Sequence, residues 1–431
     1  MGAIASLRDY LDVLEAAGQL VRIPSTVKLM HELANVAAAI GRQGRGAVLF
    51  ERPLAASFPV FAGAVTTPQL AALALGCELD QVSETMGRVQ DPNEGIAPVR
   101  VDTAAWQANV LQGDAVDLAK LPVPTHGLHD GGPFITGGVT VSKDPEGGRG
   151  NLSYNRMQIL GKRTLGFNVN AWRDTMAFYR VQEAKDAPLE IAIAIGLDPA
   201  VMIAAGCRYN DDELQIAGAI RKRPIPVAKG ITVDVDIPAT AEIVIEGLLP
   251  PHERRLEGPL AEFHGYYGEL WNSPILEVTA ICYRDAPIYQ TIVPGAAEHI
   301  YLGNVLPREP LLLRFVRHVS KNVTAVHIPP YANGFAAVVQ LDKSHPGEPK
   351  NVAFGAMTAH VNVKKVIVVD PDVDIYDPAD VLWALTNRVD WGRDTFKVPG
   401  AQGHEMDPTA DAEGVHTKIG IDATYKPERR E

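Results

Sequence analysis

Apolar residues recur at helical spacing near the N-terminus, and short apolar runs separate the helical stretches. Ser6 and Gly18 flank the first of these stretches, whose apolar positions are Leu7, Tyr10, Leu11 and Leu14. Serine favours a helix N-cap and glycine a helix end, so a helix is predicted between them. The other expected elements are helices at 28–42 and 68–90 and strands at 20–23 and 47–50. Residues 1–105 therefore predict an N-terminal α/β subdomain.

The middle of the chain alternates apolar and polar residues with period two, as half-buried strands do. Ile and Val, which favour strands, are frequent there. Helices are expected only at about 173–185 and 211–223, the second ending before Pro224. Mostly antiparallel strands with few helices indicate a barrel or a strongly curled sheet over residues 106–298. The predicted strands are 154–160, 165–170, 190–195, 231–236, 242–246, 274–283 and 287–293.

Helices and strands alternate again after residue 300, which predicts a second α/β domain over residues 299–400 and an α+β protein overall. Asp377-Pro378 combines an N-cap with a first-turn proline and so predicts a helix start. Residues 401–431 are polar and contain Pro and Gly, so we expect a C-terminal loop or tail that is ordered by contact with the rest. The remaining elements expected here are helices 308–321 and 350–360 and strands 323–328, 335–341 and 366–369.

Composition narrows the class of protein. The 431 residues are 46% apolar, enough for two or three domains with a sizeable core. The net charge of -12, without a run of Lys or Arg, argues against nucleic-acid binding. The three cysteines lie far apart and match neither disulfide nor metal spacing. The N-terminus reads as an amphipathic helix rather than a signal peptide, and no apolar run approaches the roughly 18 residues that cross a membrane. We therefore expect a cytoplasmic protein without membrane insertion.

Candidate chemistry begins at Asn151-Leu152-Ser153-Tyr154-Asn155-Arg156, which follows a Gly-rich turn and precedes an apolar run. Polar groups at the mouth of a strand are a common way to hold a ligand on a rigid frame. From these six residues alone, a polar loop before a strand is the favoured interpretation. Asp130-Gly131-Gly132-Pro133 is a second candidate, because two glycines before a proline suit either a tight turn or a close approach of backbone to a bulky group.

Glu257-Gly258-Pro259-Leu260-Ala261-Glu262 places two carboxylates five positions apart around a Gly-Pro bend. On a helix or a straight strand these two would not share a face, whereas around a bend they can converge. Two converging carboxylates beside an arginine supply a general acid and an orienting ion pair. Two solvated glutamates are the alternative, but the aromatic residues that follow favour a wall for a flat substrate or cofactor. These are Phe263, His264, Tyr266 and Tyr267.

Two helix starts carry further polar residues. Arg173, at the end of Asn168-Val169-Asn170-Ala171-Trp172-Arg173-Asp174, would hold a phosphate together with free backbone N–H groups. At the acidic start Asp211-Asp212-Glu213, the helix dipole suffices to explain two of the three carboxylates, and the pattern itself does not single out Glu213. Neither a G-x-G-x-x-G nor a P-loop pattern is present, so a dinucleotide or P-loop site is not expected, and the histidines show no ligand spacing.

Taken together, these blocks resemble the UbiD family of prenylated-flavin-dependent decarboxylases. The resemblance covers nearly the whole chain. It implies a split-barrel-like flavin domain joined to an α/β oligomerisation domain, with a C-terminal segment that reaches a neighbouring subunit. The blocks that carry it are Asp130–Ile135, Asn151–Arg156, Gly196–Ala200, Glu213–Ala219, Pro238–Gly247, Glu257–Glu262, Asp370–Ala384 and Lys418–Thr424.

The resemblance also implies roles for single residues. Asn151 and Glu213 match ligands of a divalent ion that holds the cofactor phosphate; oxygen ligands suit Mn²⁺ or Mg²⁺, and K⁺ is a further candidate. Many members have a histidine ligand where this chain has Trp172-Arg173-Asp174, so either Asp174 is the third ligand or Asn151 and Glu213 hold the ion alone. The residues implied to contact the cofactor are Ser153, Tyr154, Asn155, Arg156, Asn168, Val169, Asn170, Arg173, Asp174, Glu213 and Lys418.

The expected activity is a reversible, non-oxidative decarboxylation of an aromatic or α,β-unsaturated carboxylic acid with prenylated FMN. Arg156 would orient the carboxylate, paired with Glu257, and Glu262 would deliver a proton. The implied partners are the acid and CO₂, a flavin prenyltransferase that supplies the cofactor, and further copies of the chain in a homodimer or homohexamer. Two alternatives stay open: a catalytically silent flavin-binding or assembly subunit of a larger carboxylase, and a lyase that uses its metal directly on the substrate.

Overall fold

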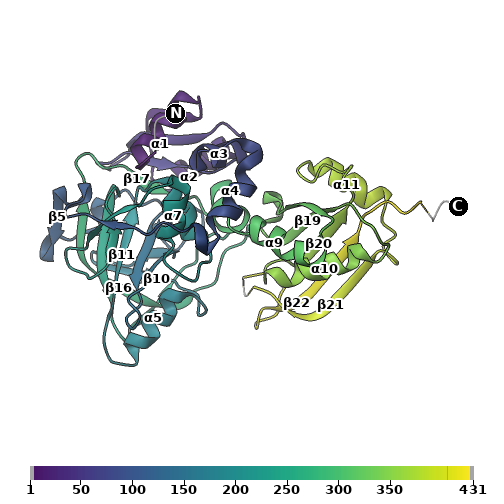
Figure 1. The fold of residues 1–431 in the computed structure, drawn as a ribbon. Coiled ribbons are helices and arrows are strands. Elements are labelled where there is room, and N and C mark those ends of the chain that lie inside the picture. The colour runs from purple at the N-terminus through teal and green to yellow at the C-terminus, as the bar shows by residue number, and fades with distance from the viewer. Residues whose placement is uncertain (1–3, 405, 428–431) are drawn as a thin grey trace. The chain divides into compact units, whose positions relative to one another are not determined.

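The computed structural model describes residues 4–404 and 406–427, and the chain divides into two compact units, Met1–Leu302 and Gly303–Glu431 (Figure 1). Both units combine helices with sheets, which confirms the α+β class. The finer division of the chain into four parts stays a prediction. No helix within the described ranges combines the length and apolarity needed to cross a membrane.

The first unit opens with α1 (Leu7–Ala16), and the Ser6 side chain caps it by accepting the N–H of Asp9, as predicted. A four-stranded sheet follows in the order β1-β2-β3-β17. The helix expected over 68–90 is wrong as a continuous element, because Gly76 adopts a left-handed conformation with φ of 69° and ends α3. The bounds are β1 Leu20–Val27, α2 Glu32–Arg42, β2 Ala47–Pro53, β3 Val60–Ala62, α3 Pro68–Leu75, α4 Val82–Val89 and β17 Tyr289–Thr291.

A ten-stranded, largely antiparallel sheet dominates the first unit and curls into a half-barrel, as the alternation predicted. Its main path runs β6-β9-β10-β16-β14-β11-β7-β8, and β5 and β15 both pair with β16. Fully buried Ile and Val side chains of β11 and β14 lie in its core. The bounds are β5 Asn109–Gln112, β6 Phe134–Ile135, β7 Val139–Lys143, β8 Gly150–Tyr154, β9 Met157–Ile159, β10 Thr164–Phe167, β11 Leu189–Ile195, β14 Ile243–Leu249, β15 Arg254–Glu257 and β16 Trp271–Tyr283.

Three helices pack against β8, namely α5 (Asp174–Glu183), α6 (Pro199–Gly206) and α7 (Leu214–Arg221). The pattern did not predict α6, because it is buried on nearly every side and so lacks a polar face. A separate three-stranded sheet has the order β13 (Asp236–Pro238), β12 (Pro226–Lys229) and β4 (Val99–Arg100).

Two of the expected strands do not form as single strands over the expected residues. The strand expected at 231–236 is wrong, because the Glu246 carboxylate accepts the N–H groups of Ile231 and Thr232 and holds them in a loop between β12 and β13. The strand expected at 154–160 is divided, since β8 ends at Tyr154 and β9 begins at Met157. This break places Arg156 directly before β9.

The second unit is a three-layer sandwich around a five-stranded sheet in the order β18-β19-β20-β22-β21. Neighbouring residues of β20 serve opposite faces: Val366 and Val368 pack with α9 and α10, and Ile367 and Val369 pack with α11. Asp377 caps α11 through the N–H of Ala379, as predicted. The bounds are α9 Glu309–Val319, β18 Val323–His327, β19 Ala336–Leu341, α10 Glu348–Ala359, β20 Lys365–Val369, α11 Pro378–Asn387, β21 Thr395–Gln402 and β22 Val415–Asp422.

The tail expected after residue 400 is therefore wrong over Val415–Asp422, which forms a strand between β20 and β21. Polar and charged residues obscure it in the sequence, although Ile419 and Ile421 alternate with them and Ile421 is buried. Short connecting turns are helical at Leu79–Gln81, Pro92–Glu94, Ala105–Ala108, Gly113–Ala115, Leu118–Lys120, Ala297–Ile300, Tyr301–Val305 and Pro330–Ala332.

Candidate active site

A buried arginine joins the two carboxylates of the Gly-Pro bend. Arg156 donates from Nη2 to Glu257 Oε1 at 2.8 Å and from Nε at 3.2 Å, and its Nη1 donates to Glu262 Oε1. The Glu257 side chain is fully buried, and those of Arg156 and Glu262 are each 10% exposed. The bend thus brings its two carboxylates to one point, as its sequence predicted.

The electrostatics of the three groups follow from burial and charge. Burial raises the pKa of Glu262 by more than the neighbouring Arg156 lowers it. Burial alone would lower the pKa of Arg156, but the two carboxylates outweigh it and raise that pKa. Glu262 therefore keeps a proton to higher pH than an ordinary glutamate, beside an arginine that stays charged. This combination suits a general acid next to an anion-binding group.

Glu257 is held by more than the ion pair. Asn168 Nδ2 donates to the same Oε1 at 2.6 Å and lies 3.4 Å from Ser273 Oγ. Glu257 Oε2 is buried and has no hydrogen-bond partner in the described part of the chain. An unpaired buried carboxylate oxygen is costly, so it fits a hydrogen-bond donor on a bound group.

A second polar cluster lies where β7, β8 and α5 meet. Asn151 Nδ2 donates to Ser142 Oγ and to Thr175 Oγ1, each at 3.2 Å. Thr175 Oγ1 also lies 3.2 Å from Ser153 Oγ, to which Asn155 Nδ2 donates at 2.9 Å. The sequence reasoning missed Ser142, Thr140 and Thr175. The period-two polar positions Thr140 and Ser142, which stand opposite Ser153 and Asn151 in the register, were the available signal.

Glu213 adjoins this cluster. It stands at the N-cap position of α7, is 3% exposed, and its Oε2 accepts the Leu152 N–H at 2.8 Å. Burial raises the pKa of Glu213 to about 8. No ion pair joins it to a cationic side chain of the described residues. A buried carboxylate that forms no ion pair with a described cationic side chain, bonded to the backbone next to Asn151, fits a hard divalent ion.

Asp174 is placed differently. It is the first residue of α5, its side chain is 44% exposed, and its Oδ2 pairs with Arg149 Nη2 at 2.6 Å. The N-cap position belongs to Arg173, and no side-chain capping bond is made there. The carboxylate is thus already balanced by a cation, which favours Asn151 and Glu213 over Asp174 as metal ligands. Within the described ranges, no three His, Cys, Asp or Glu side chains converge as metal ligands.

The remaining predicted residues occupy several places. Tyr154 donates its hydroxyl to the Met202 carbonyl at 3.0 Å. Arg173 stacks on the half-exposed Trp172 ring at 4.7 Å, while Val169 packs against the core and the Asn170 carbonyl accepts the Arg173 N–H. Lys418 belongs to the second unit, where its buried Nζ donates to the Met357 carbonyl at 2.8 Å. Its contact with the cofactor stays a prediction.

The aromatic residues after the bend do not form one buried wall. Phe263 is buried and packs edge-on against His264 and His299, with ring centroids 5.3 and 6.0 Å apart. Tyr266 is 62% exposed, and the Tyr267 hydroxyl accepts the His129 N–H at 3.0 Å.

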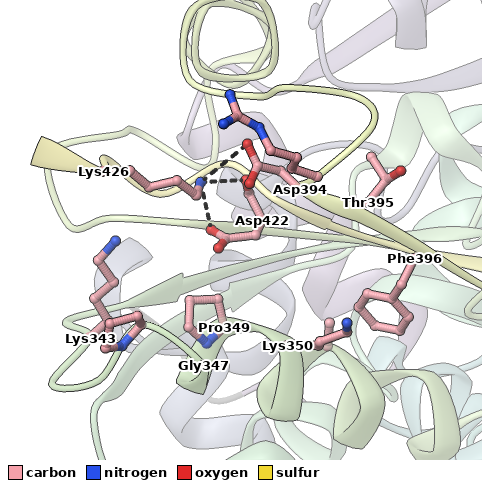
Figure 2. Close-up of a pocket in the computed structure, with 12 residues that line it drawn as sticks. Lys343, Gly347, Pro349, Lys350, Asp394, Thr395, Phe396, Asp422 and Lys426 are labelled. Atoms are coloured by element: carbon pink, nitrogen blue, oxygen red, sulfur yellow. Dashed lines mark hydrogen bonds and ion pairs between the residues drawn. The ribbon is translucent and has the colours of Figure 1, made fainter. Parts of the chain in front are cut away.

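A pocket in the second unit is drawn in Figure 2 and contains none of the predicted site residues. Its volume is about 210 Å³. Lys426 lies 3.2 Å from Asp422 and 3.8 Å from Asp394, and Lys350 lies 5.2 Å from the centre of the Phe396 ring. Lys426 thus faces carboxylates, Lys350 faces an aromatic ring, and Lys343 donates to Thr424 Oγ1 at 2.8 Å. The pocket shows no arrangement comparable to the cluster of Arg156, Glu257 and Glu262, called the Arg156 cluster below.

Models of known protein families match most of the chain. Three family models, all of 3-octaprenyl-4-hydroxybenzoate carboxy-lyase, match successive parts of the chain: the N-terminal domain over residues 11–89, the Rift-related domain over 98–297 and the C-terminal domain over 301–423. The residues that form the Arg156 cluster all fall within the match to the Rift-related domain.

Solved structures agree over the whole length. The UbiD-class enzyme HmfF from Pelotomaculum thermopropionicum, in complex with FMN, is 38% identical, with 99% of this chain and 96% of that chain covered and a TM-score of 0.93. The 3,4-dihydroxybenzoic acid decarboxylase from Enterobacter cloacae is 30% identical, covering 100% and 96%, with a TM-score of 0.94. The vanillic acid decarboxylase from Sedimentibacter hydroxybenzoicus is 29% identical, covering 99% and 94%, with a TM-score of 0.90. The chain therefore belongs to the UbiD family of carboxy-lyases.

Proposed function

We propose that this enzyme catalyses the reversible, non-oxidative decarboxylation of an aromatic or α,β-unsaturated carboxylic acid with prenylated FMN as cofactor. The observation that carries the proposal is the buried Arg156 that engages both Glu257 and Glu262. Structures similar to this chain were solved with FMN and, for an evolved dimeric form of HmfF, with prFMN, which supports the choice of cofactor. Neighbours that act on 3,4-dihydroxybenzoic and vanillic acid support an aromatic substrate.

The chain's own residues supply binding and proton transfer. Arg156 would bind the substrate carboxylate, and Glu257, which accepts a hydrogen bond from Asn168, would fix the guanidinium in its plane. When bound, the prenylated flavin supplies the electron sink for the pair left by departing CO₂. Glu262 would give its proton to the carbon that lost CO₂ and recover one from water, and the raised pKa of Glu262 keeps that proton available.

Cofactor retention would depend on the second polar cluster. We propose that Asn151 and Glu213 hold a divalent ion, Mn²⁺ or Mg²⁺, which in turn binds the cofactor phosphate. Burial of Glu213 without a cationic partner in the described part of the chain supports this assignment. Tyr154, Asn155, Asn168 and Arg173 are the residues proposed to contact the flavin. K⁺ as a second ion, a flavin prenyltransferase as cofactor supplier and a homodimer or homohexamer belong to the same proposal, and a dimeric neighbour supports the dimer.

The experiment is co-expression with a flavin prenyltransferase, followed by absorption spectra and CO₂ release from a panel of aromatic and α,β-unsaturated acids. In D₂O, deuterium incorporation into the decarboxylated product, at the carbon that lost CO₂, would reveal slow turnover in either direction. We expect cofactor-dependent release and exchange with at least one acid. A fully loaded protein that neither releases CO₂ nor exchanges deuterium would instead indicate a silent subunit, and activity without flavin would indicate a metal-only lyase.

A further inference from the structure

The backbone of the bend is held by two side chains that lie outside the Arg156 cluster. Gln158 is 6% exposed, and its Oε1 accepts the Gly258 N–H at 2.8 Å. Its Nε2 donates to the Gly131 carbonyl, also at 2.8 Å. A single buried amide therefore ties the start of the bend to the loop that contains Gly131, and both ends of the amide are used.

The position of Gln158 follows from the strand that carries it. Gln158 is the second residue of β9, and Arg156 lies two positions earlier, directly before that strand. Arg156 reaches the two carboxylates of the bend, while Gln158 reaches the peptide group between them. One strand end thus presents a cation to the side chains and an amide to the backbone of the same segment.

Asp130 holds the far side of the bend. Its Oδ1 accepts the N–H of Ala261 at 3.0 Å, directly before Glu262. Its Oδ2 accepts the N–H groups of Gly127 at 2.6 Å and of His126 at 3.1 Å, which fixes the carboxylate itself. The Gly131 N–H also donates to the Pro259 carbonyl at 2.8 Å. The bend is therefore bonded at residues 258, 259 and 261.

We propose that Gln158 and Asp130 are positioning residues for proton delivery: they set the backbone of the bend so that the Glu262 carboxyl is held on Arg156 and aimed at the reacting carbon. This inference rests on the proposed decarboxylation. The physical reason is that proton transfer requires the donor within hydrogen-bond reach, and a displacement of about 1 Å can cost about 10²-fold in rate. Neither residue contacts the reacting atoms in this assignment; both act through Glu262.

The test is Gln158→Met in the cofactor-loaded enzyme, which keeps side-chain volume and removes both hydrogen bonds. We expect kcat to fall at least about 10-fold, with KM and the cofactor absorption spectrum within about two-fold of the parent. The solvent deuterium isotope effect on kcat should rise, because proton delivery becomes slower than the other steps. Asp130→Ala, which frees the Ala261 N–H, should change the isotope effect in the same direction.

Gln90→Met is the matched control, because Gln90 is also a buried glutamine of the first unit, 5% exposed, and lies outside the bend. It should lower melting without raising the isotope effect. An unchanged isotope effect in Gln158→Met, or a loss of kcat explained by lost cofactor alone, would overturn the positioning role.

A crystal structure of Gln158→Met separates this inference from the proposed activity. Displacement of the Glu262 carboxyl from Arg156 is the expected result, and a bend that keeps both carboxylates on Arg156 would refute the inference even if no substrate were ever turned over. A parent enzyme that loads cofactor but releases no CO₂ would instead refute the proposed function and leave this geometric result to decide the inference.

Discussion

Three carboxylates of the first unit differ in role because their neighbours differ. Glu262 is buried against Arg156, Glu213 is buried against backbone N–H groups, and Asp174 is partly exposed and paired with Arg149. The surroundings of Glu262 favour a proton donor beside an anion site, and those of Glu213 favour a ligand of a cation. Asp174 forms an ion pair near the surface. Each assignment predicts a different response to the loss of charge.

Glu262→Gln should retain the cofactor and lose turnover by about 10²-fold or more, because an amide is isosteric but carries no transferable proton. The pKa of Glu262 is raised by burial, so its acid form persists above the usual range and turnover of the parent should fall as pH rises through that raised pKa. Steady-state rates across pH on the loaded enzyme measure both. Activity within a few-fold of the parent would remove Glu262 from the mechanism.

Asn151→Ala and Glu213→Ala should each lower the content of metal and cofactor, rather than slow the chemistry alone. The reason is that the side-chain oxygens of Asn151 and Glu213 are proposed to bind the ion that would hold the cofactor phosphate. Elemental analysis and absorption spectra after purification measure the two contents. Asp12→Ala, on the surface of α1, serves as a matched control. Metal and cofactor contents equal to those of the parent in both variants would refute the metal assignment.

Asp174→Asn should lower the free energy of unfolding by no more than about 1 kcal/mol, since its ion pair with Arg149 is partly exposed. Metal retention should be kept, because the carboxylate is already balanced by the guanidinium. Metal titration of the loaded variant and its thermal midpoint are the measurements. A clear loss of metal affinity would return Asp174 to the ligand set that the sequence suggested.

At the scale of elements, the site depends on two loops that pass each other closely. A Cβ at Gly131 would lie 2.0 Å from the Gly258 carbonyl oxygen and 2.8 Å from Gln158 Nε2. The Asp-Gly-Gly-Pro pattern therefore reflects a close approach of two backbones rather than a tight turn alone. The sequence left two alternatives open, a tight turn and a close approach of the backbone to a bulky group. Only the fold could identify the approaching segment as the one that contains Gly258.

Gly131→Ala should displace the bend and lower kcat by about 10-fold or more, because the contact is with backbone that cannot rotate away. Gly161→Ala is the control, since a Cβ there would meet only Thr164 at 4.0 Å. Kinetics of both loaded variants, with circular dichroism to check folding, measure the effect. Equal rates for the two variants would show that the bend tolerates the shift.

At the scale of the whole molecule, the second unit has its own buried charge cluster. Asp407 is 3% exposed and accepts Lys364 Nζ at 2.7 and 2.8 Å, Thr409 Oγ1 at 2.9 Å and His416 Nδ1 at 2.9 Å. Burial would raise the pKa of Asp407, but these hydrogen bonds outweigh it and hold the pKa at about 2. The cluster ties the loop after β21 to β22 and to the residue directly before β20.

The pKa of Asp407 is lower in the folded protein than its value of about 4 in the unfolded chain, so the ionised carboxylate stabilises the fold above about pH 4. This stabilisation is lost as the pH falls towards 2. Asp407→Asn should therefore be less stable than the parent by about 2 kcal/mol at pH 7, and the difference should shrink below about pH 4. Thermal midpoints of the parent and of Asp407→Asn across pH measure this difference in stability. Asp411→Asn, in the same loop, is the control. A difference that is constant from pH 7 to pH 3 would contradict the assignment.

The sequence by itself determined the α+β class, most helices and strands, the family and the two converging carboxylates, because these follow from periodicity, capping residues and a short local motif. It did not determine the path of residues 231–236 or 415–422. There, the Glu246 carboxylate holds the first segment in a loop, and pairing with β20 and β21 makes the second a strand. Glu246 lies outside the first segment, and the order of strands in the sheet decides which strands flank the second. Neither can be read from the residues of the segment itself. For the same reason, only the tertiary structure could assign Thr175, Gln158 and the pairing of Arg149 with Asp174. Their side chains and those of their partners lie tens of residues apart in the sequence. They become neighbours only when the sheet curls and brings β8, β9 and α5 together.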